Sequence, residues 1–180
     1  METFLALVSG LHARSVRFVV MGVWGANYYA HSAGLAFSTQ DHDLFLPADP
    51  ENLLKAWQVA ETLHLELSCS GEPLDSPRDL RLAERIVERR ALTSVHGAQN
   101  FLTDYSLVMA DFDFEEVWHG RRVFIDQDQE IPVASLEHIV QSKARVGRPK
   151  DRLFLETHKE ALRELLPKEE PNDRAEGGRT

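Results

Sequence analysis

The sequence is short of cysteine, of positive charge and of long apolar runs. Cys69 is the single cysteine in 180 residues, which excludes an internal disulfide framework and favours a reducing cytoplasm. The 20 Lys and Arg are outnumbered by 29 Asp and Glu, for a formal net charge of −9, which argues against broad nonspecific binding to nucleic acid. No apolar run reaches the roughly 20 residues that span a bilayer, and no basic region precedes the apolar N-terminal stretch as in a signal peptide. We therefore expect a cytoplasmic protein with no membrane segment.

What the sequence contains is typical of a folded chain. Hydrophobic residues make up 43% and charged residues 27%, and the length suits one domain. Apolar runs that end at Gly or Pro alternate with apolar residues at helical spacing. This pattern indicates an α/β (α+β) domain, a mixed β-sheet flanked by helices, over residues 1–166. Residues 167–180 contain almost no apolar side chains and predict a disordered tail.

The predicted elements follow one another closely along the chain. Strands are predicted over residues 16–21, 41–46, 64–69, 91–95, 101–109 and 122–125. Helices are predicted over residues 2–11, 24–31, 78–90, 112–119 (capped by Asp111) and 151–166, with two more that begin after Asp49 and at Ser135, the second of which ends near Gly147. Residues 71–77 are predicted to form a loop.

Two aspartates alternate on the predicted strand 41–46. Asp41 and Asp43 share one face of this strand, and His42 lies on the other, where we expect it to be a packed histidine. Carboxylates roughly 6–7 Å apart repel each other unless a cation lies between them. Mg²⁺ and Mn²⁺ prefer such oxygens and keep positions for phosphate. The alternative is two solvated acids at a strand end, and this pair alone does not decide between them.

Two further features give the aspartate pair a context. A turn with Gly22 and Gly25 follows the first predicted strand and opens a helix, where backbone N–H groups suit phosphate oxygens. Asp104 interrupts an otherwise apolar strand, and a buried Asp requires a cation, an arginine or hydrogen-bond donors. Asp111 and Asp113 are alternatives to Asp104, although acids are expected where a helix begins.

Lys143 shares a helix face with apolar residues. It follows Ile139 and Val140 at helical spacing. Its ammonium group either passes the core to reach water or points at the acidic site.

These features together resemble the nucleotidyltransferase superfamily, whose fold is similar to the catalytic domain of DNA polymerase beta. Gly22 matches the glycine that follows the first strand there, and Asp41 and Asp43, preceded by Thr39, match its Asp-x-Asp pair. Residues 131–151, with a Leu-Glu pair, Lys143 and the run Gly-Arg-Pro-Lys-Asp, resemble the closing segment of a bacterial branch. That branch is related to minimal nucleotidyltransferases and abortive-infection type II toxins, and the resemblance covers about residues 15–165.

The resemblance implies an enzyme that transfers a nucleoside monophosphate from a nucleoside triphosphate (NTP) to an acceptor. Asp41, Asp43 and Asp104 are the implied ligands of Mg²⁺ or Mn²⁺ and the catalytic residues, with Asp104 also as general base. Gly22, Gly25 and Lys143 are the implied nucleotide-binding residues. ATP is one candidate donor.

The resemblance also implies partners. A toxin-like bacterial protein would have RNA, such as tRNA, or a protein as its acceptor, and an antitoxin as its partner. Basic residues near the end of the chain, among them Arg148 and Lys150, would then supply a local surface for RNA.

Two alternative functions remain. Val23 occupies a position where the family has Gly or Ser, which favours a binding module whose catalysis has decayed. Replacing Asp41 or Asp43 would not alter such a module. A metal-dependent glycosyltransferase also uses an Asp-x-Asp pair, but the chain is short for that fold.

Overall fold

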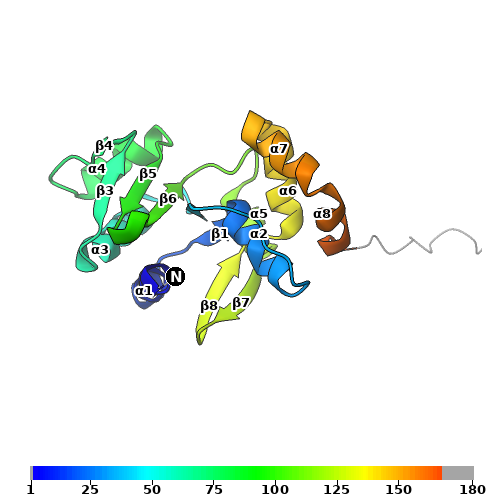
Figure 1. Cartoon of the computed structure of the whole chain (residues 1–180). Helices are drawn as coiled ribbons and strands as arrows, with labels where there is room; N and C mark the ends of the chain where they lie inside the picture. Colours follow the sequence, from blue (N-terminus) through cyan, green and yellow to red (C-terminus); the bar gives the residue numbers. More distant parts are fainter. Residues whose placement is uncertain (1, 168–180) are drawn as a thin grey trace, which may run out of the picture.

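The computed structural model describes residues 2–167 (Figure 1). The helices are α1 (Glu2–Ala13), α2 (Gly22–His31), α3 (Pro50–Thr62), α4 (Leu80–Glu88), α5 (Phe114–His119), α6 (Leu136–Val146), α7 (Pro149–Thr157) and α8 (Lys159–Leu165). The strands are β1 (Val19–Met21), β2 (His42–Phe45), β3 (Glu66–Cys69), β4 (Glu72–Pro73), β5 (Thr93–His96), β6 (Leu102–Ser106), β7 (Arg122–Asp126) and β8 (Gln129–Val133).

One mixed sheet joins all of these strands. Their order is β4-β3-β5-β6-β2-β1-β8-β7. β2 pairs with β6 and β1 with β8 in parallel, whereas the other neighbours are antiparallel. The predicted α/β architecture is confirmed.

The helices divide between two halves of the molecule. Figure 1 shows α3 and α4 beside β3 and β5 in one half of the molecule, and α2, α6 and α7 in the other. The fully buried Trp57 of α3 donates its indole N–H to Thr93 Oγ1 of β5 at 3.2 Å. α2 contacts β1 and β2, and α6 packs against α2. The end of β2 therefore lies where these two halves meet.

Helix boundaries follow local capping chemistry at three predicted points. Asp49 Oδ1 accepts a hydrogen bond from the Glu51 amide at 2.9 Å, which starts α3. Ser135 accepts from the His138 amide at the start of α6. Gly147, with φ +61°, ends α6 in the left-handed conformation. These boundaries confirm the sequence prediction.

Other boundaries differ from the prediction. The N-cap of α5 is Asp113, because an isolated bridge between Met109 and Phe112 holds Asp111 in a turn. The predicted helix 151–166 is two helices, α7 and α8, divided at His158.

Two strands, β8 and β4, were not predicted. β8 contains Pro132, which lowers its strand signal. Pro132 is nevertheless the register partner of Val123 in the edge strand β7. The short β4 likewise lies in a segment predicted as a loop.

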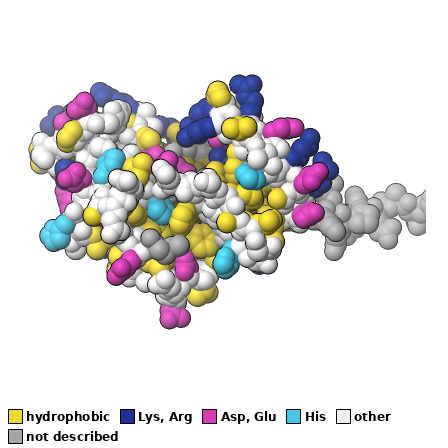
Figure 2. Space-filling model, in the orientation of Figure 1, with side chains coloured by type: hydrophobic (Ala, Val, Ile, Leu, Met, Phe, Trp, Pro, Cys, Tyr) yellow, Lys and Arg dark blue, Asp and Glu magenta, His cyan; other side chains and the backbone are white. Residues whose placement is uncertain are grey.

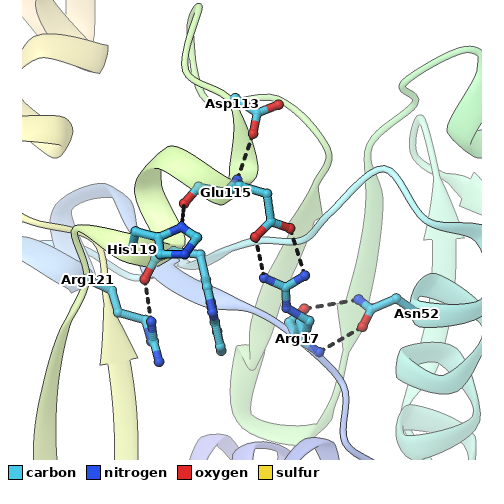
Figure 3. A network of polar contacts seen from close by, with 7 residues as sticks. Arg17, Asn52, Asp113, Glu115, His119 and Arg121 are labelled. Carbon is cyan, nitrogen blue, oxygen red and sulfur yellow. Dashed lines mark hydrogen bonds and ion pairs between the residues drawn. The ribbon is translucent and has the colours of Figure 1, made fainter.

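A polar network fixes α5 to the segment that precedes β1 (Figure 3). The Arg17 guanidinium donates to both carboxylate oxygens of Glu115 at 2.7 Å, and its backbone N–H donates to Asn52 Oδ1 of α3, also at 2.7 Å. Arg17 also lies over the rings of Phe114 and Trp118. The network therefore ties α3, β1 and α5 together.

No described helix is long and apolar enough to cross a membrane. The predicted tail over residues 167–180 lies outside the described residues, apart from Pro167.

Candidate functional site

Two carboxylates lie side by side on neighbouring parallel strands. Asp43 of β2 and Asp104 of β6 are register partners, so their side chains leave the same face of the sheet. Both side chains are partly buried. Asp41 is also partly buried and immediately precedes β2. The pairing of β2 with β6 thus brings together Asp43 and Asp104, which are 61 residues apart in the chain.

The surroundings of Asp43 disfavour its negative charge. Burial raises the pKa of Asp43 to about 6, and the negative charges of Asp104 and Asp41 add to the shift. The positive charges of Lys143 and Lys150 oppose it. The positive charges of the two lysines, which belong to α6 and α7, thus offset the raised pKa of Asp43 only in part.

Gly22 makes the close approach of Asp43 to α2 possible. Its φ is +68°, and a Cβ atom there would lie 2.0 Å from Asp43 Oδ2. Glycine is therefore required both for the backbone conformation and for the contact. α2 begins at Gly22, and its N-cap residue Met21 makes no side-chain capping bond. The first amides of α2 are thus free of a side-chain cap beside the Asp43 carboxylate.

Gly25 and Val23 face the core instead of the acids. A Cβ atom on Gly25 would meet the Val20 carbonyl oxygen and Ile139 Cδ1 at 3.1 Å each. Gly25 therefore lets α2 pack closely on β1 and α6, and this placement gives no support to its predicted contact with phosphate. The Val23 side chain packs against the core, which leaves its backbone amide in the first turn of α2.

Lys143 takes part in a buried cluster of charges between α6 and α7. Its Nζ donates to Asp151 Oδ1 at 3.0 Å, and Arg148 Nε donates to Asp151 Oδ2 at 2.8 Å. Asp151 is 1% exposed. Burial alone would raise the pKa of Asp151, but the hydrogen bonds from Arg148 and Lys143 outweigh it and hold the pKa below its ordinary value. Asp151 thus fixes the position of Lys143.

His42 lies on the face of β2 opposite Asp43. Its ring stacks on Phe4 with the centroids 4.4 Å apart, and its Nδ1 lies 3.0 Å from the Leu102 carbonyl oxygen. Burial lowers the pKa of His42, so the ring is neutral at pH 7 and Nδ1 donates to that carbonyl. The prediction of a packed histidine is confirmed.

The acids fit a divalent cation only in part. No three His, Cys, Asp or Glu side chains within residues 2–167 gather closely enough to hold a metal ion. Mg²⁺ is usually bound by one or two carboxylates, with waters and substrate phosphates as its other ligands. Asp43 and Asp104 supply oxygens of that kind on one face, so the donor set fits a metal ion that arrives with a nucleotide.

The alternative acids have other roles. Asp113 caps α5, and Asp111 lies in the preceding turn. Lys150, predicted as part of a basic surface, has a positive charge that lowers the pKa of Asp43. One residue near the site was not predicted: Ser94 of β5, which donates to Asp104 Oδ1 at 2.6 Å. No local pattern in the sequence indicates its role, because its contact with Asp104 depends on the pairing of β5 with β6.

The surface in this region is hollowed. Figure 2 shows a notch between the two halves of the molecule, with Lys and Arg side chains along the rim formed by the helices of the second half. Lys and Arg side chains are also present on the half that contains α3 and α4 (Figure 2).

Comparisons with known proteins show what the fold is similar to. No family model and no curated protein matches the chain. The crystal structure of the lincosamide antibiotic adenylyltransferase LnuA, with lincomycin bound, matches 88% of this chain and 95% of its own, with a TM-score of 0.52 and 13% identity. The crystal structure of ANT(2″)-Ia in complex with adenylyl-2″-tobramycin matches 91% of this chain and 92% of its own, with a TM-score of 0.51 and 14% identity.

The chain has the fold of these nucleotidyltransferases. At these identities the likeness concerns the fold, and the chemistry depends on the residues described above.

Proposed function

We propose that this protein is a metal-dependent nucleotidyltransferase, which transfers a nucleoside monophosphate from an NTP to a hydroxyl group. The observation that carries the proposal is the register of Asp43 with Asp104, with Gly22 against one carboxylate and with the positive charges of Lys143 and Lys150 lowering the pKa of Asp43. A structural pair of acids would not need two lysines and an uncapped helix start beside it.

The donor nucleotide binds between β2 and the α6–α7 region in this proposal. The uncapped amides at the start of α2 and the ammonium group of Lys143 hold triphosphate oxygens. Mg²⁺ or Mn²⁺, held by Asp43 and Asp104 with Asp41 nearby, supplies charge neutralisation and lowers the pKa of the acceptor hydroxyl.

The chemical step is a displacement at the α-phosphorus atom. The acceptor oxygen forms a bond to that atom, the bond to the bridging oxygen of the β-phosphate breaks, and pyrophosphate leaves. Solvent water takes the proton of the acceptor hydroxyl, because Ser94 holds one carboxylate oxygen of Asp104 and the metal ion would take the other. Lys143 balances the charge that develops on the leaving group.

The acceptor approaches over β6, β5 and β3 in this proposal, because the lysines occupy the other side. None of these three strands contains Lys or Arg. A polyanionic acceptor would find little to neutralise its charge there. We therefore propose a small hydroxyl compound, and the antibiotics named with the two similar structures support an acceptor of that size. An RNA or protein acceptor and an antitoxin partner stay predictions.

Binding of labelled ATP, CTP, GTP and UTP with Mn²⁺ tests the proposal. We expect metal-dependent binding of at least one NTP, and a loss of at least tenfold in affinity for the double variant Asp41→Asn/Asp43→Asn. Because protons compete with the metal ion at Asp43, whose pKa is about 6, affinity should fall as the pH is lowered from 8 to 5.

Two outcomes of this binding experiment would contradict the proposal. A folded protein that binds no NTP, or whose double variant binds as tightly as the wild type, would contradict the proposal. The binding module with decayed catalysis would then be the better account.

A further inference from the structure

Asp104 receives a hydrogen bond from the strand on its far side. Ser94 of β5 is its antiparallel register partner, and Ser94 Oγ donates to Asp104 Oδ1 at 2.6 Å. That length is typical of a hydroxyl that donates to a charged carboxylate. Asp43 and Ser94 thus flank Asp104 on the two neighbouring strands.

This bond distinguishes the two oxygens of Asp104. A carboxylate rotates easily about its last torsion, because that torsion has broad minima. With Oδ1 engaged by Ser94, the torsion is fixed. Oδ2 makes no hydrogen bond among the described residues, so it remains available on the face shared with Asp43.

The serine also has no competing partner. Its hydroxyl donates to Asp104 alone in the described structure. The next serine on this face, Ser68 of β3, is paired in register with Ser94 but interacts with His96 Nε2 at 2.7 Å. Two similar serines thus lie on adjacent strands, and one of them touches the acid.

We propose that Ser94 is a positioning residue, which holds the Asp104 carboxylate so that Oδ2 is presented to a divalent cation shared with Asp43. The inference rests on the proposed function. Ser94 touches neither the metal ion nor the substrates and acts through Asp104. Hydrogen bonds to metal-ligating carboxylates typically change metal affinity by about 10–100-fold.

Mn²⁺ binding to the full chain, measured by electron paramagnetic resonance with and without an NTP, tests this role. For Ser94→Ala we expect an increase of about tenfold in the Kd for Mn²⁺, with a thermal midpoint near that of the wild type. Ser94→Thr keeps the hydroxyl and suits a strand, so it should restore the wild-type Kd within about twofold.

Ser68→Ala is the matched control. It removes a serine hydrogen bond from the same sheet face, and its Kd for Mn²⁺ should stay within about twofold of the wild type. An unchanged Kd in Ser94→Ala, or equal losses in both alanine variants, would overturn the positioning role while the proposed function stands. A wild-type protein that binds no Mn²⁺ even with an NTP present would overturn the proposed function and this inference with it.

Discussion

At the scale of single residues, the site depends on a contact between a glycine and a carboxylate. Gly22 has no side chain to hold Asp43 Oδ2 away from the start of α2, and any Cβ atom would overlap that oxygen. The same residue has a positive φ, so two separate requirements exclude other residues. The glycine therefore shapes the acidic site directly.

Gly22→Ala should therefore abolish metal-dependent NTP binding. The left-handed backbone alone costs a non-glycine residue about 1–2 kcal/mol, and displacement of Asp43 adds to this cost. Calorimetric NTP binding and thermal unfolding measure the two effects.

Gly34→Ala separates the contact from the strain. Gly34 has almost the same φ, +69°, but no atom lies within 4 Å of a Cβ built there. We expect it to lose stability but to bind NTP normally. Equal binding by the two variants would show that the Gly22–Asp43 contact does not matter.

Residue-level prediction from sequence depends on chemistry that is local. Asp41 and Asp43 stand out because two acids alternate on a strand, and Asp104 stands out in an apolar run. Ser94 could not be found, since its role depends on which strand pairs with β6. Gly22 and Gly25 both belong to the turn after the first predicted strand, so the sequence does not distinguish them. Only the packing of α2 on β1 shows that Gly25 faces the core.

At the scale of elements, the junction of α6 and α7 orients the Lys143 side chain. Gly147 ends α6, and Pro149 begins α7. This sharp turn brings Asp151 back against Lys143. The turn therefore sets which side chains of the two helices face the acids.

Asp151→Asn should loosen this junction. Removing one partner of a buried ion pair costs about 3 kcal/mol, and the released Lys143 should weaken NTP binding about tenfold or less. The folded-state pKa of Asp151 is lowered, so its contribution is present at neutral pH and is lost as the pH falls through that pKa. The difference in unfolding free energy between wild type and variant should therefore shrink towards pH 3.

Glu115→Gln serves as the control for a broken ion pair. Glu115 is an exposed residue of α5 and pairs with Arg17 (Figure 3). Arg17 precedes β1, whereas Gly22 follows the other end of that strand. Exposed pairs contribute little to stability because solvent screens them, so this variant should bind NTP as the wild type does. If Asp151→Asn also binds normally, Lys143 does not need its partner.

Element-level prediction failed where tertiary pairing overrides local signals. β8 contains Pro132, yet its place between β1 and β7 stabilises it. The helix 151–166 has continuous helical composition, and its division at His158 has no Gly or Pro to announce it. By contrast, Asp49 and Ser135 cap their helices through their own side chains, which sequence alone can predict.

At the scale of the whole molecule, charge separates the two sides of the site. The net charge is −9, but Lys143 of α6 and Lys150 of α7 carry positive charges that lower the pKa of Asp43. The strands beyond Asp104 contain no Lys or Arg. This asymmetry favours a triphosphate on the lysine side and an uncharged or cationic acceptor on the other.

The most direct test of the account is anomalous diffraction from crystals grown with Mn²⁺ and a non-hydrolysable NTP analogue. We expect an Mn²⁺ peak at about 2.2 Å from carboxylate oxygens of Asp43 and Asp104, with the triphosphate directed towards α2 and Lys143. A nucleotide bound elsewhere, or a metal ion that neither aspartate contacts, would contradict the account.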